Sequence, residues 1–255
     1  MKFSNSHNNK EKFTDFGFET IPFEEKDKKV KSVFDSVAKD YDLMNDLMSL
    51  GLHRLWKKAL IDWLSPKSNQ KLLDIAGGTG DIACKFLQAG GGFVDILDIN
   101  EKMIQVAKNK KKLKNFSHKI NWLLASAENI PCEDNSFDRI TISFGLRNIA
   151  NKKKALDEIY RVLKPGGRFC CLEFSKLESD IFESFYKLWS FKVLPKLGKV
   201  VLNDEKSYIY LAESISVFPN QNTLSNMLSQ SGFVQVKYRN LTGGIVAIHS
   251  GWKLD

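Results

Sequence analysis

The chain has 255 residues, of which 43% are hydrophobic and 27% charged, a composition that excludes wholesale disorder. It contains no apolar run of the ~18 residues that a membrane span requires and no signal-peptide core at its start, so we expect a cytoplasmic protein. The net charge of +8 admits a nucleic-acid partner.

The N-terminal part is divided into an arm and a helical segment. Residues 1–30 are polar and non-periodic, and we expect them to form a loosely ordered arm ahead of one domain that spans 31–255. Helical periodicity starts at Ser32 and stops at Ser65–Pro66, which predicts a helical cover over 31–66.

Strand and helix patterns then alternate along the chain. Apolar, strand-like runs lie at 71–76, 93–98, 120–125, 138–144 and 168–174, and helical patterns lie between them at about 81–88, 100–110 and 151–163. Strands separated by helices form right-handed βαβ units. The pattern predicts an α/β fold with a Rossmann-like, mostly parallel sheet and helices on both faces.

The C-terminal part completes this sheet. The sequence Pro165-Gly166-Gly167 is expected to end a helix and turn the chain into the next strand. After a helical insertion at 181–230, two strand-like runs at 233–240 and 244–250 are joined by a short glycine turn. Such a joint is typical of a hairpin, so we expect seven strands in all, one of them antiparallel to the rest.

Lysines and cysteines are distributed in ways that favour structural roles. Seven lysines against one acid between Glu101 and Ile120 carry +6 of the charge, with Phe116 as the one interleaved aromatic residue before Trp122. We therefore expect a solvated face and no nucleic-acid partner, with a phosphate or anionic-lipid patch as the alternative. The cysteines show no metal-binding spacing, and we expect buried thiols and no metal site; they are Cys84, Cys132, Cys170 and Cys171.

A glycine-rich loop lies in the sequence KLLDIAGGTGD, at residues 71–81. It follows a predicted strand and precedes a predicted helix, so its backbone can turn sharply and present free N–H groups to a ligand. Asp98 ends the next strand, where a carboxylate can accept hydrogen bonds from both hydroxyls of a ribose. These features fit a nicotinamide cofactor or S-adenosylmethionine, and a tight turn without a ligand is the alternative.

The charges around the loop distinguish the two cofactors. A dinucleotide fingerprint reads G-x-G-x-x-G, and the alanine at the last position here is a permitted substitute. Asp81 at the mouth of the loop would repel a pyrophosphate but suits a cofactor with a sulfonium and an amino group, and Asp74 adds to that bias. The electrostatics favour S-adenosylmethionine.

Longer segments carry a resemblance to a known family. The loop, LDIN (97–100), DNSFDRI (134–140) and RVLKPGG (161–167) resemble class I S-adenosylmethionine-dependent methyltransferases. From about Thr14 to the C-terminus the chain is similar to the ubiquinone/menaquinone biosynthesis C-methyltransferases. The segments that carry this narrower resemblance are VFDSVAKDYDLMNDLMSLGLHRLWK (33–57), DIAGGTGDIA (74–83), ITISFGLRNI (140–149), LEFSK (172–176), SYIYLAESI (207–215) and NLTGGIVAIHSGWK (240–253).

The resemblance implies a reaction and a set of cofactor contacts. That family methylates a ring carbon of a polyprenylated benzoquinol and, in some members, of demethylmenaquinol. Thr79 would lie beside the methionine part of the cofactor, Asp98 on the ribose, and Ser143 near the methyl-donating end, with a strand cap as the alternative for Ser143. The full set of implied cofactor-binding residues is Gly78, Thr79, Gly80, Asp98, Ser126, Ala127 and Ser143, with Ser126 and Ala127 bordering the adenine.

Arg147 and Asn148 are the implied catalytic residues. They lie where amine methyltransferases often carry an (Asp/Asn)-Pro-Pro-(Tyr/Phe) motif, and its absence counts against an amine or nucleobase target. A guanidinium can stabilise a phenolate but is a poor proton acceptor, so Arg147 is expected to orient an oxygen. A salt bridge to an acid such as Asp157 is its alternative role. Further candidates are His53 and His249 for acid–base work, Tyr41 and Tyr208 as pocket walls, and Glu173 at a strand end.

The segment at 181–201 is rich in aromatic residues and lysines. It predicts either a lid that contacts a polyprenyl tail or the inner face of the membrane, or a helix packed on the edge of the sheet. Homo-oligomers and contacts with other quinone-biosynthesis enzymes are compatible with the sequence. The alternative functions are a nicotinamide-dependent oxidoreductase, a nucleic-acid methyltransferase and a non-catalytic member of a quinone-synthesis complex.

Overall fold

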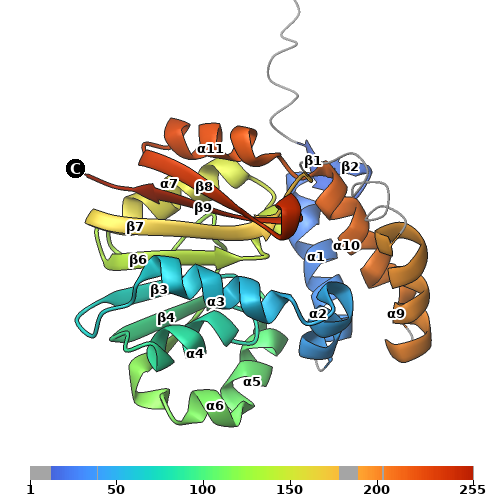
Figure 1. Cartoon of the computed structure of the whole chain (residues 1–255), viewed down its shortest axis with the longest axis horizontal. Coiled ribbons are helices and arrows are strands. Elements are labelled where there is room, and N and C mark those ends of the chain that lie inside the picture. Colours follow the sequence, from blue (N-terminus) through green and yellow to red (C-terminus); the bar gives the residue numbers. More distant parts are fainter. Residues whose placement is uncertain (1–12, 39, 178–188, 203, 255) are drawn as a thin grey trace, which may run out of the picture.

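The computed structural model describes residues 13–38, 40–177, 189–202 and 204–254, and within them a seven-stranded sheet forms the centre (Figure 1). The strand order is β5-β4-β3-β6-β7-β9-β8, and β9 is antiparallel to both of its neighbours. The predicted fold class is therefore confirmed, including the single antiparallel strand. The strands are β3 (Lys71–Ile75), β4 (Phe93–Asp98), β5 (Ile120–Leu124), β6 (Phe137–Ser143), β7 (Leu163–Phe174), β8 (Val234–Leu241) and β9 (Val246–Trp252).

Each face of the sheet carries its own hydrophobic core, because neighbouring residues of a strand point to opposite faces. Leu72 belongs to the core under α3 (His53–Leu64) and α4 (Asp81–Gln88). Leu73 belongs to the opposite core, under α7 (Lys152–Val162) and α11 (Gln221–Gln230). The helices α5 (Glu101–Asn109) and α6 (Lys111–Lys114) continue the first layer beside β4 and β5.

A further layer lies across the carboxyl ends of the parallel strands, on the right in Figure 1. It contains a hairpin, β1 (Phe13–Phe16) and β2 (Glu19–Pro22), and the helices α1 (Phe23–Val37), α2 (Tyr41–Ser49), α9 (Leu194–Leu202) and α10 (Glu205–Val217), with a π-helical turn at Trp189–Val193. This layer covers the edge of the sheet where ligands of open α/β folds bind.

The structure differs from the expected N-terminal arm, since residues 13–30 form the hairpin and most of α1. Their order comes from contacts distant in sequence. The Lys26 ammonium is buried and donates to Asp15 at 3.2 Å and to the Arg147 carbonyl at 3.3 Å. The Phe16 ring stacks on Tyr210 at 4.3 Å. The expectation for residues 1–12 lies outside the described residues.

The turn expected at 165–167 is part of strand β7. Phe137 pairs with Leu163 and Arg139 with Arg168, so the glycines form an irregularity within the paired strand. Gly166 has φ +72° and donates its N–H to the Lys253 carbonyl at 2.8 Å. The expected turn is therefore an irregularity inside β7, and its hydrogen-bonding partner lies near the C-terminal end of the chain.

The remaining compositional predictions concern thiols, metals and the membrane. Cys84, Cys170 and Cys171 are buried free thiols as expected, whereas Cys132 is only half-buried. Among the described residues, no group of three or more His, Cys, Asp or Glu side chains is placed to hold a metal ion. Nor does this part of the chain contain a helix with the length and apolarity to cross a membrane.

Candidate active site

The glycine loop connects β3 to α4 and is fastened to the end of β4. The Gly78 N–H donates to Asp98 Oδ2 at 2.8 Å, and the Asn100 N–H donates to Asp98 Oδ1 at the same distance. Gly78 has φ +54°, a left-handed conformation that glycine adopts without strain. One carboxylate therefore sets the shape of the loop and of the turn after β4.

The surroundings of this loop fit the cofactor that the sequence favours. Each Asp98 oxygen accepts one backbone N–H and keeps a lone pair for a further donor such as a ribose hydroxyl. Burial raises the pKa of Asp98, while its backbone hydrogen bonds favour the ionised form. Ser143 ends β6, the strand beside β3, and its Oγ is buried without a hydrogen-bond partner in the described structure. An unpaired buried hydroxyl beside the loop can hydrogen-bond to a polar ligand.

Two glycines of the loop and Thr79 lie in close contact with other parts of the protein. A Cβ on Gly77 would meet the Ile96 side chain at 2.5 Å, and one on Gly80 would meet Leu113 at the same distance. These glycines allow the sheet and α6 to approach the loop. The Thr79 hydroxyl donates to Asp42 Oδ1 at 3.0 Å, which ties α2 to the loop.

The predicted adenine border follows β5. The Ser126 Oγ accepts the N–H of Glu128 at 3.2 Å, which forms a local turn, and Ala127 is buried in one of the two cores. Asp98 and Ala125 are joined by a backbone hydrogen bond of 3.1 Å, so this turn lies beside the end of β4. The structure thus brings Ser126 and Ala127 near Asp98 and leaves their contact with an adenine a prediction.

Asp74, the acid before the loop, is buried in the sheet. Its Oδ1 accepts the Thr141 hydroxyl at 2.9 Å, and its Oδ2 has no partner within the described residues. Burial raises the pKa of Asp74 to about 7. An unfolded aspartate titrates near ~3.9, so the folded protein holds an extra proton between about pH 4 and pH 7, and its stability falls as the pH rises through that range.

The variant Asp74→Asn should remove this pH dependence. Measured by urea unfolding, the stability of the variant relative to the wild type should increase by about 3 kcal/mol between pH 5 and pH 8. As a control, Asp157→Asn alters an exposed carboxylate that is paired with Lys153. The difference in unfolding free energy between this variant and the wild type should stay nearly constant from pH 5 to pH 8. A constant difference for Asp74→Asn would show that Asp74 is ionised throughout.

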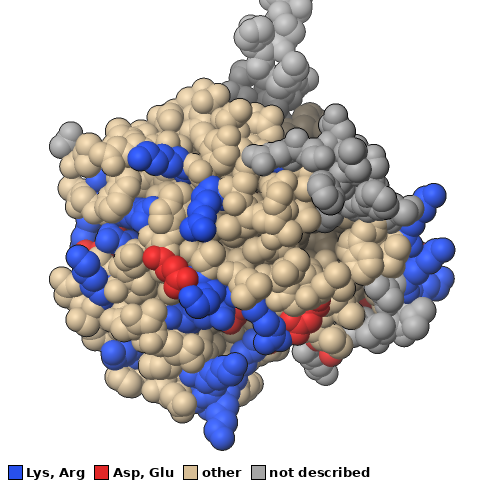
Figure 2. Space-filling view, viewed as in Figure 1, with Lys and Arg blue, Asp and Glu red and all other residues tan. Residues whose placement is uncertain are grey.

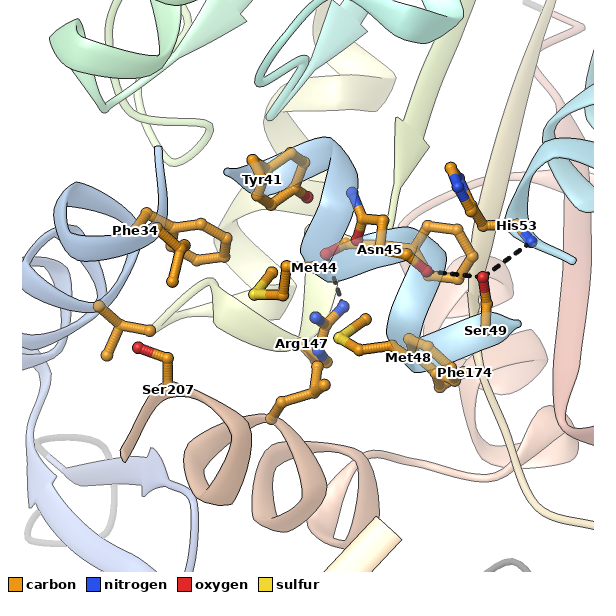
Figure 3. Close-up of a pocket in the computed structure, with 14 residues that line it drawn as sticks. Phe34, Tyr41, Met44, Asn45, Met48, Ser49, His53, Arg147, Phe174 and Ser207 are labelled. Atoms are coloured by element: carbon orange, nitrogen blue, oxygen red, sulfur yellow. Dashed lines mark hydrogen bonds between the residues drawn. The ribbon is translucent and has the colours of Figure 1, made fainter. Parts of the chain in front are cut away.

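A crevice with aromatic and apolar walls lies between the sheet edge and the covering helices (Figure 3). It is lined by Val33, Phe34, Val37, Tyr41, Met44, Asn45, Met48, Ser49, His53, Phe144, Arg147, Phe174, Ser207 and Leu211. Its closed volume is about 20 Å³, roughly the space of one water molecule. This space is smaller than an aromatic ring, so a ring would enter the crevice only if its walls moved apart.

Arg147 is buried in this crevice and is paired with Glu173. Its Nη1 donates to Glu173 Oε1 at 2.9 Å and to the Phe144 carbonyl at 2.5 Å, while its Nε lacks a partner within the described structure. The salt bridge considered from sequence therefore exists, but with Glu173, because Asp157 pairs with Lys153. The guanidinium is held by its Nη1, and one buried N–H remains available for a substrate oxygen.

Several of the other candidate residues do not line the crevice. Asn148 Oδ1 accepts the Tyr210 hydroxyl at 2.9 Å, and Asn148 is not among the crevice-lining residues. Tyr41 lines the crevice as expected, whereas Tyr208 is fully buried in the adjoining apolar cluster. His249 lies under α11 with its Nε2 2.9 Å from the Gln221 carbonyl oxygen, and burial lowers its pKa to about 4. This histidine is part of the packing between β9 and α11.

The lining contributed by α2 beyond Tyr41 was missed from sequence. Met44, Asn45, Met48 and Ser49 all line the crevice, and Figure 3 shows them along one side of it. They belong to the segment 33–57 that carries the family resemblance, so the signal was present, but periodicity alone gave them no role.

A second hollow, of about 370 Å³, lies outside the glycine loop. Its lining is Asp42, His53, Arg54, Thr79, Gly80, Asp81, Cys84, Lys85, Lys110, Lys111, Lys112 and Leu113. Figure 2 shows lysine and arginine side chains gathered on this lower part of the face, and Lys111, Lys112 and Lys114 are exposed there. The basic run thus forms an exposed face, as the sequence predicted.

Comparison with known proteins identifies a family that spans most of the chain. The sequence pattern of the ubiE/COQ5 methyltransferase family matches residues 23–253. A ubiquinone/menaquinone biosynthesis C-methyltransferase UbiE from Acidiphilium cryptum is 52% identical over 240 residues, covering 94% of this chain and 96% of that protein. The protein of the same name from Hydrogenovibrio crunogenus is 49% identical over 249 residues, covering 97% and 98%.

Solved structures with low sequence identity share the fold. A Thermotoga maritima protein described as an S-adenosylmethionine-dependent methyltransferase aligns with a TM-score of 0.62 at 20% identity, covering 87% of this chain and 99% of that one. Phosphoethanolamine N-methyltransferase 2 of Haemonchus contortus, in complex with S-adenosyl-L-methionine, aligns with a TM-score of 0.59 at 17% identity, covering 78% and 52%. At such identities the likeness concerns the fold.

Proposed function

Because the chain belongs to the ubiE/COQ5 methyltransferase family, we propose that it methylates a ring carbon of a polyprenylated benzoquinol in ubiquinone biosynthesis, with demethylmenaquinol of menaquinone biosynthesis as a second substrate. It is an S-adenosylmethionine-dependent C-methyltransferase. One observation carries the proposal. About 50% of the residues are identical, over nearly the full length, to those of relatives named for this one activity. A nicotinamide-dependent oxidoreductase and a nucleic-acid methyltransferase are not favoured.

We assign two groups of site residues, one to the cofactor and one to the quinol ring. Gly78, Asp98 and Ser143 would hold the cofactor, with Ser126 and Ala127 beside its adenine. When bound, S-adenosylmethionine supplies an electrophilic methyl group on a positively charged sulfur. The aromatic walls of the crevice suit a planar ring, and the free Arg147 N–H suits one of its oxygens. The negative charge that develops on that oxygen would lie beside a guanidinium held in place by Glu173.

The direct test is product analysis. The protein would be incubated with isotope-labelled methyl donor and reduced short-chain benzoquinol and naphthoquinol analogues, and the label located by mass spectrometry. We expect the label on a ring carbon of one or both quinols. Label on an oxygen, or no labelled product from well-folded protein that binds S-adenosylhomocysteine, would contradict the proposal.

We further propose that the enzyme reaches its polyprenylated substrate by peripheral contact with an anionic membrane. Phe18 and Phe191 are exposed, and their ring centroids are 6.1 Å apart. Three exposed lysines follow on the adjoining turn and α9, namely Lys192, Lys196 and Lys199. Apolar rings next to lysines are typical of surfaces that bind the lipid headgroup region. Part of the segment 181–201, for which the sequence predicts a lid or membrane contact, lies outside the described residues, including Phe182, Phe185, Tyr186 and Lys187.

Replacing Phe191 by alanine and these three lysines by glutamine should weaken binding to anionic vesicles about 10-fold or more, as measured by flotation. A matched control replaces Lys111, Lys112 and Lys114 by glutamine, which removes the same charge from the other basic face and should have little effect. Equal losses in both variants would indicate unspecific attraction, and no loss in either would contradict membrane contact. Assembly with a second copy or with other quinone-biosynthesis enzymes stays a prediction.

A further inference from the structure

His53 connects the two hollows of the active-site region. Among the residues that the structure describes, it alone lines both the aromatic crevice and the hollow outside the glycine loop. It is the first residue of α3, and its backbone N–H donates to Ser49 Oγ at 3.2 Å, as Figure 3 shows. The imidazole therefore lies between the proposed quinol site and the loop proposed to hold the methyl donor.

The ring of His53 is oriented by a carboxylate. Its Nε2 lies 2.8 Å from Asp46 Oδ1, and Asp46 also accepts two hydrogen bonds from Arg54, at 3.0 and 2.6 Å. An ionised carboxylate accepts hydrogen bonds only, so the proton of the neutral ring is on Nε2. The Nδ1 atom then carries a lone pair, and it is buried without a hydrogen-bond partner in the described part of the chain.

Charged groups from three helices surround the ring. Asp46 comes from α2, Arg54 and Lys57 from α3, and Asp81 from α4, where it pairs with Lys57 at 3.0 Å. Burial lowers the pKa of His53, and Asp46 opposes this shift. The imidazole is thus neutral at neutral pH and has a carboxylate partner that stabilises the protonated form. An imidazole held by a carboxylate with its second nitrogen free is the arrangement of a general base.

We infer that His53 is the proton acceptor for the quinol hydroxyl, an inference that rests on the proposed function. The hydroxyl proton passes to Nδ1, and the electron pair of the O–H bond stays on the oxygen and conjugates into the ring. The ring carbon bonds to the methyl carbon while the carbon–sulfur bond breaks and its electron pair leaves with sulfur. The ring C–H proton is lost to solvent and His53 returns its own to the oxygen, so one proton is released in total.

Arg147 and His53 take different roles in this scheme. The guanidinium keeps its proton and stabilises the oxygen, whereas the imidazole removes the proton from it. In Figure 3 the two side chains lie at different places along the crevice. The quinol oxygen that accepts from the guanidinium is thus the one whose proton the imidazole takes up.

The test compares His53→Asn with His118→Asn, which alters an exposed histidine outside the site. The His53 variant should lose about 10²–10³-fold in kcat, while its affinity for S-adenosylhomocysteine by calorimetry changes less than about twofold. Its deficit should shrink for quinol analogues with more acidic hydroxyls, because these ionise without a base. A deficit equal for all analogues, or a parallel loss of S-adenosylhomocysteine binding, would overturn the inference.

The variant Asp46→Asn provides a second test that keeps the imidazole. Loss of the carboxylate charge lowers the pKa of His53, so the fall of kcat on the acid side should move to lower pH. An unchanged profile would count against the inference. A wild-type protein that methylates no quinol would overturn the proposed function and this inference together. A wild type that does, with a His53→Asn variant of undiminished kcat, overturns this inference alone.

Discussion

Replacing Arg147 by methionine should lower kcat by about 10²–10³-fold and the free energy of unfolding by about 3–5 kcal/mol. The first effect follows if the free guanidinium N–H stabilises the developing oxyanion. The second follows because Glu173 is 1% exposed and its charge would lose its partner in the interior. Affinity for S-adenosylhomocysteine should change little, because Arg147 belongs to the crevice and not to the glycine loop.

The double variant Arg147→Met with Glu173→Gln separates the two effects. The neutral amide no longer leaves a buried charge unpaired, and it can still accept the Phe174 N–H that Glu173 Oε1 accepts at 2.9 Å. We expect it to recover about 2 kcal/mol of stability in urea unfolding without recovering kcat. If kcat returned with stability, Arg147 would serve the fold alone. Lys153→Met with Asp157→Gln, on an exposed pair, is the matched control.

The sheet could be predicted from sequence because its signal is local. Each strand-like run and each helix between β3 and β7 shows its own periodicity, and the order of alternation leaves few topologies. The hairpin at 13–22 and the start of α1 show no such signal. They are ordered by the contact of Lys26 with Asp15 and by its buried hydrogen bond to the Arg147 carbonyl, which joins residues 121 positions apart.

The same distinction applies to the site. The glycine loop could be predicted because it is a short sequence motif, and Asp98 could be predicted because it ends a predicted strand. The partner of Arg147 could not be chosen, since Asp157 lies on the helix that follows and Glu173 on the next strand. The register that pairs Ser143 with Leu172 brings Glu173 beside the loop after β6, and only a structure gives that register.

Asp98 is the proposed cofactor contact whose replacement has the largest expected effect. Replacing it by alanine should weaken S-adenosylhomocysteine binding about 10²–10³-fold by calorimetry, because the carboxylate is proposed to accept from ribose hydroxyls and also fixes the loop. The variant leaves the N–H groups of Gly78 and Asn100 without their acceptor, so stability should fall by about 2 kcal/mol or more.

A control on the same strand separates loss of the fold from loss of the ligand contact. Asp95→Ala removes the partner of Lys71, at 2.8 Å, toward the other end of β4, and should lower stability without a comparable change in S-adenosylhomocysteine affinity. The variant Asp98→Asn keeps one carbonyl acceptor and should bind with intermediate affinity. If Asp98→Ala were destabilised but bound S-adenosylhomocysteine as tightly as the wild type, the carboxylate would serve only to shape the loop. The ribose would then need another acceptor at the carboxyl edge of the sheet.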